Sequence, residues 1–311
     1  MLSMEQRLRM LETPAGRIDL VIDTDAYNEI DDQFAIAYAL CAGEKLNVRA
    51  LYAAPFLNQK SVSPEDGMEK SYQEIRKLLS LAGVERQVLR GSRQYLPDEK
   101  TAVPSPASED LAGMAMAYSP ERPLYVAAIG AITNVASALL MNPAIAERMV
   151  VVWLGGNALE WPHNREFNIR QDVAAARVVF ASGVPLVMLP CFGVTSAFTT
   201  TEPELNHWLR GRNPLCDYLV QNTISEAERY ATGHVWSRVI WDVTAVGWLL
   251  NDAGRLMQDR LITTPVPEYD HRWAANPNGS LCRYVYFIKR DALFEDLFLR
   301  LARGCGDMPE A

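Results

Sequence analysis

Short apolar runs alternate with amphipathic, helix-like stretches between residues 18 and 189, and this alternation constrains the fold more than any other feature. The strand-like runs cover residues 18–22, 47–54, 87–90, 124–129, 149–154 and 185–189, with helix-like stretches at 34–41, 66–82, 134–141 and 173–182. This order predicts βαβ units, in which parallel strands are covered by helices on both faces. We therefore expect an α/β fold with a mostly parallel, open, Rossmann-like sheet.

The pattern changes after Pro190, where helix-like stretches dominate. They cover residues 202–210, 215–230, 242–251 and 291–302, and one late strand-like run covers 281–288. The sequence therefore predicts a largely helical C-terminal part. A chain of 311 residues with 49% hydrophobic content can bury a large core, and α/β chains of this length often form one domain. We expect a single domain over residues 1–311.

Charge and cysteine usage narrow the possible partners and the location. The 38 acidic and 30 basic residues give a net charge of −8, which disfavours nucleic acid and anionic membranes as main partners and favours a small molecule. Five scattered cysteines without a Cys-x-x-Cys pair predict neither a disulfide framework nor a zinc site. With no signal-peptide-like segment and no apolar stretch of spanning length, we expect a cytoplasmic protein.

Carboxylates gather directly after the first strand-like run. Asp23, Asp25, Asp31 and Asp32 lie within ten residues, at the edge where ligands bind in open α/β sheets. Asp31 and Asp32 have a simpler explanation as helix-capping residues. Capping does not account for all four, because their mutual repulsion raises their pKa values unless a cation or bound protons offset it. A hard cation with oxygen ligands is the simplest such partner.

Further polar motifs follow the later runs in a fixed order. After the first carboxylates come Gly130 to Asn134, Gly155-Gly156, Glu166-Phe167-Asn168 and Trp241-Asp242. From Val21 to about Leu301 this ordered set resembles the calcium-dependent nucleoside hydrolases, often called inosine-uridine preferring nucleoside hydrolases. The resemblance implies an enzyme that cleaves the N-glycosidic bond of ribonucleosides to free base and ribose, in purine or pyrimidine salvage. It also implies a homodimer or homotetramer.

The resemblance implies a Ca²⁺ cofactor and assigns its ligands. The carboxylates of Asp25, Asp32 and Asp242 match the metal ligands, as does the main-chain carbonyl of Ile129. Calcium would take these oxygens together with water, lower the pKa of that water and orient it against a sugar carbon. Asp25 would then accept the proton, and the surrounding carboxylates would stabilise an oxocarbenium-like centre.

The same resemblance assigns the groups that hold the sugar. Asp31, Glu166 and Asn168 match residues that bind the ribose hydroxyls. Asn157 is the candidate for the 5′-hydroxyl, with Asn164 and Asn58 as alternatives.

The base-binding side departs from the inosine-uridine group, which carries a histidine before the late aspartate. Here Trp241 stands in that place, as in purine-specific members, where aromatic stacking helps the departing purine. We therefore expect Trp241 to be catalytic, with a preference for purines. Stacking contributes only about 1 kcal/mol beyond buried area, so a further group is needed. Tyr95 and Trp161 are candidates for an opposing ring, and His234 for a substitute acid.

The turn between Asp25 and Asp31 also departs from the family. Five residues intervene here, against the usual three, and the usual Pro-Gly is absent. Tyr27, Asn28 and Glu29 are therefore candidates for entering the pocket. These departures leave two alternatives open, namely a non-catalytic relative that binds a nucleoside or polyol, and a hydrolase of another glycoside.

Overall fold

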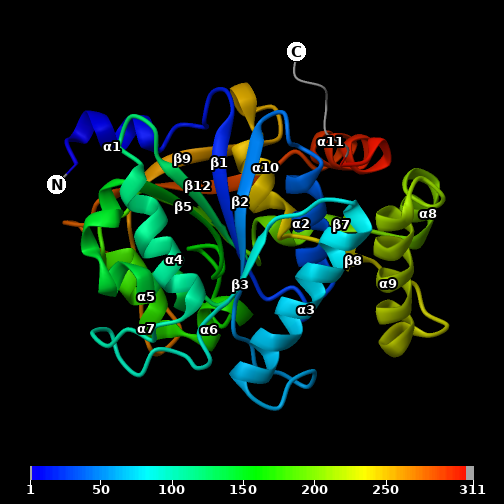
Figure 1. Cartoon of the computed structure of the whole chain (residues 1–311), viewed down its shortest axis with the longest axis horizontal. Coiled ribbons are helices and arrows are strands. Elements are labelled where there is room, and N and C mark those ends of the chain that lie inside the picture. The colour runs from blue at the N-terminus through cyan, green and yellow to red at the C-terminus, as the bar shows by residue number, and fades with distance from the viewer. Residues whose placement is uncertain (1, 306–311) are drawn as a thin grey trace.

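The computed structural model describes residues 2–305 and contains an eight-stranded sheet with helices on both faces (Figure 1). The strand order is β3-β2-β1-β4-β5-β6-β12-β9, and the neighbours are parallel except for β12 and β9. The eight strands are β1 (Ile18–Thr24), β2 (Leu46–Ala53), β3 (Gln87–Arg90), β4 (Leu124–Ala128), β5 (Met149–Leu154), β6 (Leu186–Leu189), β9 (Met257–Thr263) and β12 (Leu281–Ile288). The expected α/β fold with a mostly parallel sheet is confirmed.

Helices cover the sheet, and two small two-stranded sheets lie outside it. The helices are α1 (Met4–Met10), α2 (Asp31–Leu40), α3 (Pro64–Ala82), α4 (Pro106–Met114), α5 (Thr133–Met141), α6 (Phe167–Gln171), α7 (Val173–Ala181), α8 (Glu202–Trp208), α9 (Pro214–Ala231), α10 (Val243–Leu249) and α11 (Arg290–Arg303). The small sheets pair β7 (Thr199–Thr200) with β8 (Arg238–Val239), and β10 (Val266–Pro267) with β11 (Trp273–Ala274). Within residues 2–305, no helix is long and apolar enough to cross a membrane.

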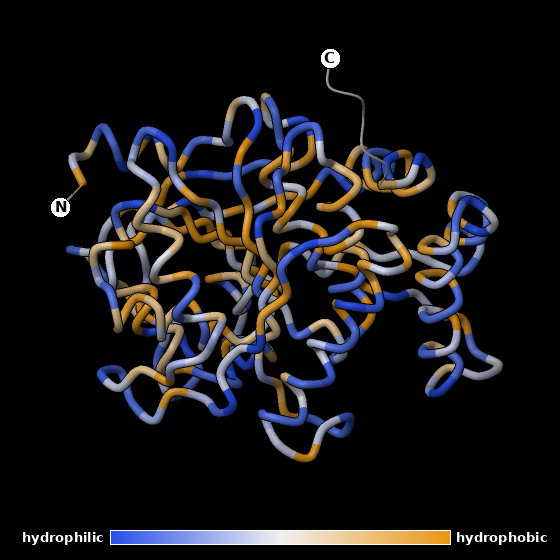
Figure 2. The backbone as a smooth tube through the Cα atoms, in the orientation of Figure 1, coloured by the Kyte–Doolittle hydropathy of each residue, from blue (hydrophilic) through white to orange (hydrophobic). Residues whose placement is uncertain are grey.

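Side chains alternate between two cores, one on each face of the sheet. In β1, Leu20 and Ile22 pack into a core with α2, α3, α9, α10 and α11, whereas Val21 packs into a core with α4, α5 and α7. Figure 1 shows these two groups of helices on opposite sides of the strands. In Figure 2 the central strands are mainly hydrophobic and the outer turns mainly hydrophilic. Strands buried on both faces explain the near-continuous apolar runs in the sequence.

The strand order reverses between β1 and β4, which lie side by side at the centre of the sheet. The chain runs outward from β1 through β2 to β3, and from β4 through β5 to β6. The crevice outside the carboxyl ends of two such strands is the usual ligand site in open α/β sheets. Asp25 follows β1 and Ile129 follows β4 at this crevice.

Cys41 and Cys305 form a disulfide, which the prediction of no disulfide framework did not anticipate. The bond joins the C-terminal end of α2 to the residue that follows α11 and Gly304, across a sequence separation of 264 residues. Only the tertiary packing of α11 beside α2 brings these cysteines together, so their spacing carried no signal. Because of this disulfide, cysteine usage does not support the expected cytoplasmic location, which stays a prediction.

Candidate active site

A cavity of about 260 Å³ opens at the carboxyl ends of the central strands. Its walls come from the turn after β1 and the start of α2, the segment after β2, the residue after β4, the start of α6, and the two residues before α10. The lining residues are Asp25, Asn28, Glu29, Asp31, Asp32, Asn58, Gln59, Ile129, Glu166, Phe167, Asn168, Arg170, Trp241 and Asp242. The fold thus brings the separate polar motifs of the sequence into one pocket.

Three buried carboxylates lie closest together in this pocket. Asp31, Asp32 and Asp242 each place an oxygen within 4.8 Å of the others. Asp31 and Asp32 open α2, yet Ile30 is the N-cap residue and no side chain caps this helix. The capping explanation for these two residues is therefore wrong. The longer turn before α2 still holds Asp32 in the group.

Several carboxylate oxygens in the pocket are buried without a hydrogen-bond partner among the described residues. They are both carboxylate oxygens of Asp25, Oδ2 of Asp31 and Oδ1 of Asp242. Gly130 leaves room for one of them, because a Cβ atom there would lie 3.0 Å from Asp25 Oδ1. Buried anionic oxygens without partners are costly. An all-oxygen set of this kind fits a hard cation such as Ca²⁺.

The electrostatics of the group are those of anions crowded together out of water. Burial first, and then the nearby carboxylates of Asp32 and Asp31, raise the pKa of Asp25 well above its usual value. Burial and then Asp31 do the same to the pKa of Asp242, and burial raises the pKa of Asp32 to about 7. A bound cation would reverse these shifts, because opposite charge favours the ionised form.

Asp23 lies in β1 beneath the pocket and does not line it. Its Oδ1 accepts a hydrogen bond of 2.7 Å from Asn134 Nδ2. Burial raises the pKa of Asp23 to about 7, and the hydrogen bond from Asn134 opposes the shift. The Asn134 side chain thus supports the end of β1, directly before Asp25.

Glu166 and Asn168 are held on one wall by backbone contacts. The Glu166 carboxylate caps α6 and accepts from the N–H groups of Asn168 at 2.8 Å, Ile169 at 3.1 Å and Gly156 at 2.8 Å. Gly156 makes its bond from a left-handed conformation, with φ of 75°, which glycine adopts at no steric cost. Asn168 donates from Nδ2 to the carbonyl of Ile129 at 3.3 Å, so its Oδ1 stays available for a ligand.

Asn157 lies behind the wall and outside the pocket lining. Its Nδ2 donates to the carbonyl of His163 at 3.0 Å, and its Oδ1 accepts from the N–H of Phe192 at 3.2 Å. Both polar groups of the side chain therefore join the two loops after β5 and β6. Its assignment to the substrate stays a prediction.

Three aromatic rings form a row that begins at Trp241 in the pocket lining. The Phe192 ring lies 5.6 Å from that of Trp161 in a stacked arrangement, and 5.6 Å edge-on from that of Trp241. Trp161 and Phe192 are 41% and 43% exposed, so both rings are partly accessible to solvent. Phe192 was not predicted from the sequence, because the apolar residues around it give no signal for a binding role.

The other two residues considered for the leaving base lie elsewhere. The Tyr95 hydroxyl donates to Gln171 Oε1, and the exposed His234 follows α9. Neither lines the pocket. Of the turn residues considered, Asn28 and Glu29 line it and Tyr27 does not.

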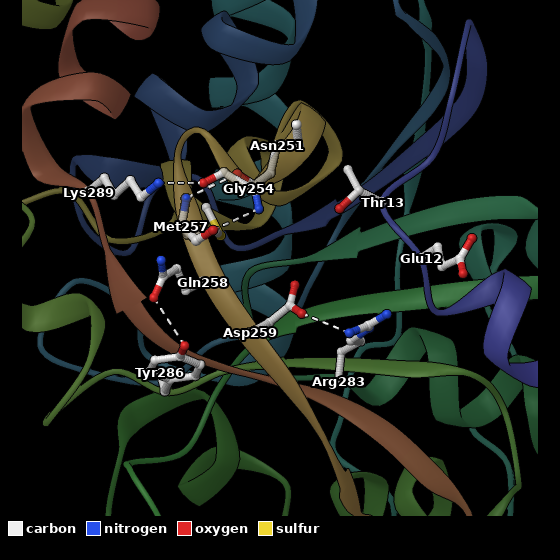
Figure 3. Close-up of a pocket in the computed structure, with 11 residues that line it drawn as sticks. Glu12, Thr13, Asn251, Gly254, Met257, Gln258, Asp259, Arg283, Tyr286 and Lys289 are labelled. Atoms are coloured by element: carbon white, nitrogen blue, oxygen red, sulfur yellow. Dashed lines mark hydrogen bonds and ion pairs between the residues drawn. The ribbon is translucent and has the colours of Figure 1, made fainter.

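A larger cavity of about 410 Å³ lies at the β9 edge of the sheet (Figure 3). Its polar side chains are largely paired with one another. Arg283 forms an ion pair of 3.0 Å with Asp259, Lys289 donates to the carbonyl of Gly254 at 2.8 Å, and Tyr286 donates to Gln258 at 3.0 Å. Unlike the central pocket, it presents no group of unpartnered buried carboxylates among the described residues.

The structure is an α/β protein with a group of buried carboxylates at the point where the strand order reverses. The sequence profile of the inosine-uridine preferring nucleoside hydrolases matches residues 20–272. The chain therefore belongs to this family, as the order of its motifs predicted.

Individual relatives agree with this assignment. Over 145 residues the chain is 31% identical to the putative pyrimidine-specific ribonucleoside hydrolase RihB of Shigella dysenteriae, covering 44% of this chain and 52% of that protein. The chain thus spans about half the length of the curated relatives it matches. The purine-preferring ribonucleoside hydrolase of Gardnerella vaginalis has a similar fold, with a TM-score of 0.74 and 19% identity over 92% of this chain and 98% of that one. A plant nucleoside hydrolase gives a TM-score of 0.73 and 20% identity over 93% and 99%.

Proposed function

We propose that this chain hydrolyses the N-glycosidic bond of ribonucleosides and releases the free base and ribose. The proposal rests on one observation above all, the unpartnered carboxylate oxygens of Asp25, Asp31 and Asp242 in a pocket beside an aromatic row. Such oxygens suit a cation and the positive charge that develops on a sugar during cleavage. Family membership supports the same reaction.

Asp25, Asp32 and Asp242 would hold a calcium ion, together with the carbonyl of Ile129. Asp31 belongs to the same group of carboxylates, and its carboxylate would lie between the ion and the sugar. When bound, the ion supplies a Lewis acid that makes a water molecule easier to deprotonate. Asp25 is the acceptor for that proton, because both of its oxygens lack a partner and lie in the lining.

The sugar is held by acceptors on two sides. Asp31 and Glu166 accept hydrogen bonds from ribose hydroxyls, and Asn168 contributes its Oδ1. The backbone bonds to Glu166 fix that carboxylate before a ligand arrives, which lowers the entropy cost of binding. As the bond to the base breaks, these buried anions stabilise the positive charge on the sugar ring.

The base stacks on the aromatic row, with Trp241 nearest the reacting carbon because Asp242 follows it directly in the pocket. We propose a preference for purines, whose two fused rings cover more of the row. The names of the compared proteins point both ways, since one is called pyrimidine-specific and the other purine-preferring. The support for purines is therefore the row itself.

The test is release of free ribose from a panel of purine and pyrimidine nucleosides in the presence of Ca²⁺. Release from at least one nucleoside, lost in Asp25→Asn, supports the proposed hydrolase. A protein that binds nucleosides in calorimetry and releases no ribose would instead be the non-catalytic relative considered from the sequence. Release from purine and pyrimidine nucleosides at equal rates would contradict the purine preference and still support the hydrolase reaction.

A further inference from the structure

The long turn between β1 and α2 carries one side chain that faces the pocket with a free donor. We propose that Asn28 is a specificity-determining residue, whose Nδ2 group donates a hydrogen bond to an acceptor oxygen of the nucleoside. This inference rests on the proposed function and adds a contact to it. Asn28 is 8% exposed and lines the pocket.

The direction of the Asn28 amide is fixed by a chain of hydrogen bonds that starts at the backbone. The N–H of Lys60 can only donate, and it donates to Asn58 Oδ1 at 2.8 Å. The other end of that amide, Nδ2, then donates to Asn28 Oδ1 at 2.6 Å. Asn28 Nδ2 therefore remains as a donor, and among the described residues it has no protein acceptor. Amide orientation is normally assigned from such networks.

Both ends of this relay are anchored. The carbonyl of Lys60 accepts a hydrogen bond of 2.7 Å from Lys70 Nζ. The ammonium group of Lys60 forms an ion pair of 3.0 Å with Glu226. At the other end, the backbone N–H of Asn28 donates to the carbonyl of Asp25 at 2.7 Å. The free donor is thus held in place relative to Asp25 before a ligand arrives.

A donor at this place complements the rest of the pocket. The carboxylates of Asp31 and Glu166 can only accept hydrogen bonds when ionised. They bind the hydrogens of sugar hydroxyls, and neither can donate a hydrogen bond to a ligand oxygen. Asn28 supplies that hydrogen bond. The oxygen it binds is either a hydroxyl of the sugar or a carbonyl of the base.

The experiment compares Asn28→Ala with wild type on a nucleoside and on analogues that each lack one oxygen. The analogues are the 2′-, 3′- and 5′-deoxynucleosides and a purine riboside without a base carbonyl. We expect Asn28→Ala to lower kcat/KM for the parent nucleoside about 10-fold. The loss in kcat/KM should disappear for the one analogue that lacks the contacted oxygen. The identity of that analogue shows whether Asn28 contacts the sugar or the base. An equal loss on every analogue would overturn the proposal.

Two further variants separate binding from folding. Tyr27→Ala changes the same turn outside the pocket lining and should leave kcat/KM within about 2-fold of wild type. Asn58→Asp keeps the acceptor for Lys60 and removes the donor to Asn28, so it should reproduce part of the loss. A loss in Tyr27→Ala as large as in Asn28→Ala would also overturn the proposal, because it would show a general effect of the turn.

The failure of this inference is distinguishable from the failure of the proposed hydrolase. If wild type releases no ribose from any nucleoside, the same comparison is made by calorimetric binding of the same analogues. Asn28→Ala should then weaken binding of the parent about 10-fold and leave binding of one analogue unchanged. Equal weakening for every analogue counts against Asn28 whether or not the protein is an enzyme.

Discussion

Glu29 and Arg238 form an ion pair, with 3.3 Å between Oε2 and Nη2, that ties the turn after β1 to the segment before Trp241. Glu29 lines the pocket, whereas Arg238 lies in β8 and also donates to the Tyr230 hydroxyl at 3.3 Å. The Arg238 side chain is 18% exposed. Two walls of the pocket that are far apart in sequence are therefore joined by one pair of charges.

Replacing Arg238 with Gln should raise KM for nucleosides several-fold, because the segment leading to Trp241 loses its attachment to the opposite wall. The melting temperature should change little, since partly exposed ion pairs contribute about 0–1 kcal/mol. Steady-state kinetics and a thermal melt measure the two effects. Arg229→Gln breaks an ion pair of 2.7 Å with Glu226 on α9 and serves as control. Equal KM values in the two variants would contradict the positioning role.

Calcium should stabilise the folded protein. A ligand that binds only the native state adds about 2.7 kcal/mol at 100 times its dissociation constant. We expect a higher melting temperature with Ca²⁺ than with a chelator, and a much smaller difference in Asp242→Asn, which removes one charge from the group of Asp31, Asp32 and Asp242. A melt that neither Ca²⁺ nor the chelator shifts would rule out the proposed metal site.

Asp25→Asn should lower kcat about 10²- to 10⁴-fold, the usual range for loss of a general base. Nucleoside binding, measured by calorimetry, should be partly kept, because the amide retains the shape of the carboxylate. Asp98→Asn alters an exposed carboxylate in the loop before α4, bonded to the N–H groups of Lys100 and Thr101, and should leave kcat unchanged. Turnover of Asp25→Asn at the wild-type rate would assign proton transfer to another residue.

Trp161→Ala should weaken turnover of purine nucleosides more than that of pyrimidine nucleosides. One stacking contact contributes about 1 kcal/mol, which corresponds to roughly 5-fold in kcat/KM. Trp208, 39% exposed and stacked on Phe298 at 6.2 Å, provides a matched control on α8. If Trp161→Ala and Trp208→Ala have the same kinetics, the base does not stack on Trp161.

Reduction of the bond between Cys41 and Cys305 should destabilise the protein by about 2–4 kcal/mol, because a long loop is no longer closed in the unfolded chain. Denaturant unfolding with and without a reductant measures the change. Cys41→Ser should match the reduced wild type and should not respond further to reductant. Cys216 is a buried free cysteine. The Cys216→Ser variant should therefore lose as much stability on reduction as wild type does. Equal stability of reduced and oxidised wild type would be the contrary result.

The buried strands were predictable because burial on both faces leaves a distinctive apolar run. The strands β3, β5 and β12 begin and end at the predicted residues. The edge strand β9 was missed, since it pairs only with β12 and carries exposed polar residues such as Gln258 and Arg260. The helix α4 was also missed, although Ser105 caps it and Pro106 occupies its first turn, a signal of a helix start that the sequence contains.

The carboxylates of the site were predictable because their motifs occur in a recognisable order after buried strands. The fold brings Asp25, Asp32 and Asp242 into one pocket. Phe192 and Arg238 were not predictable, because their roles depend on neighbours more than thirty residues away in sequence. Contacts of this kind follow from tertiary packing, and local sequence patterns do not predict them.

The disulfide between Cys41 and Cys305 also changes the topology of the molecule, since it makes a covalent ring of most of the chain. A pulling force applied on the C-terminal side of Cys305 reaches Cys41 directly and does not peel α11 away residue by residue. A translocating unfoldase that engages that side would have to draw two stretches of chain through its channel together. The first element to bear the load would be α2, the helix that carries Asp31 and Asp32. In an oxidising medium, the helix that carries two carboxylates of the pocket is thus also the helix that resists pulling from the C-terminal side.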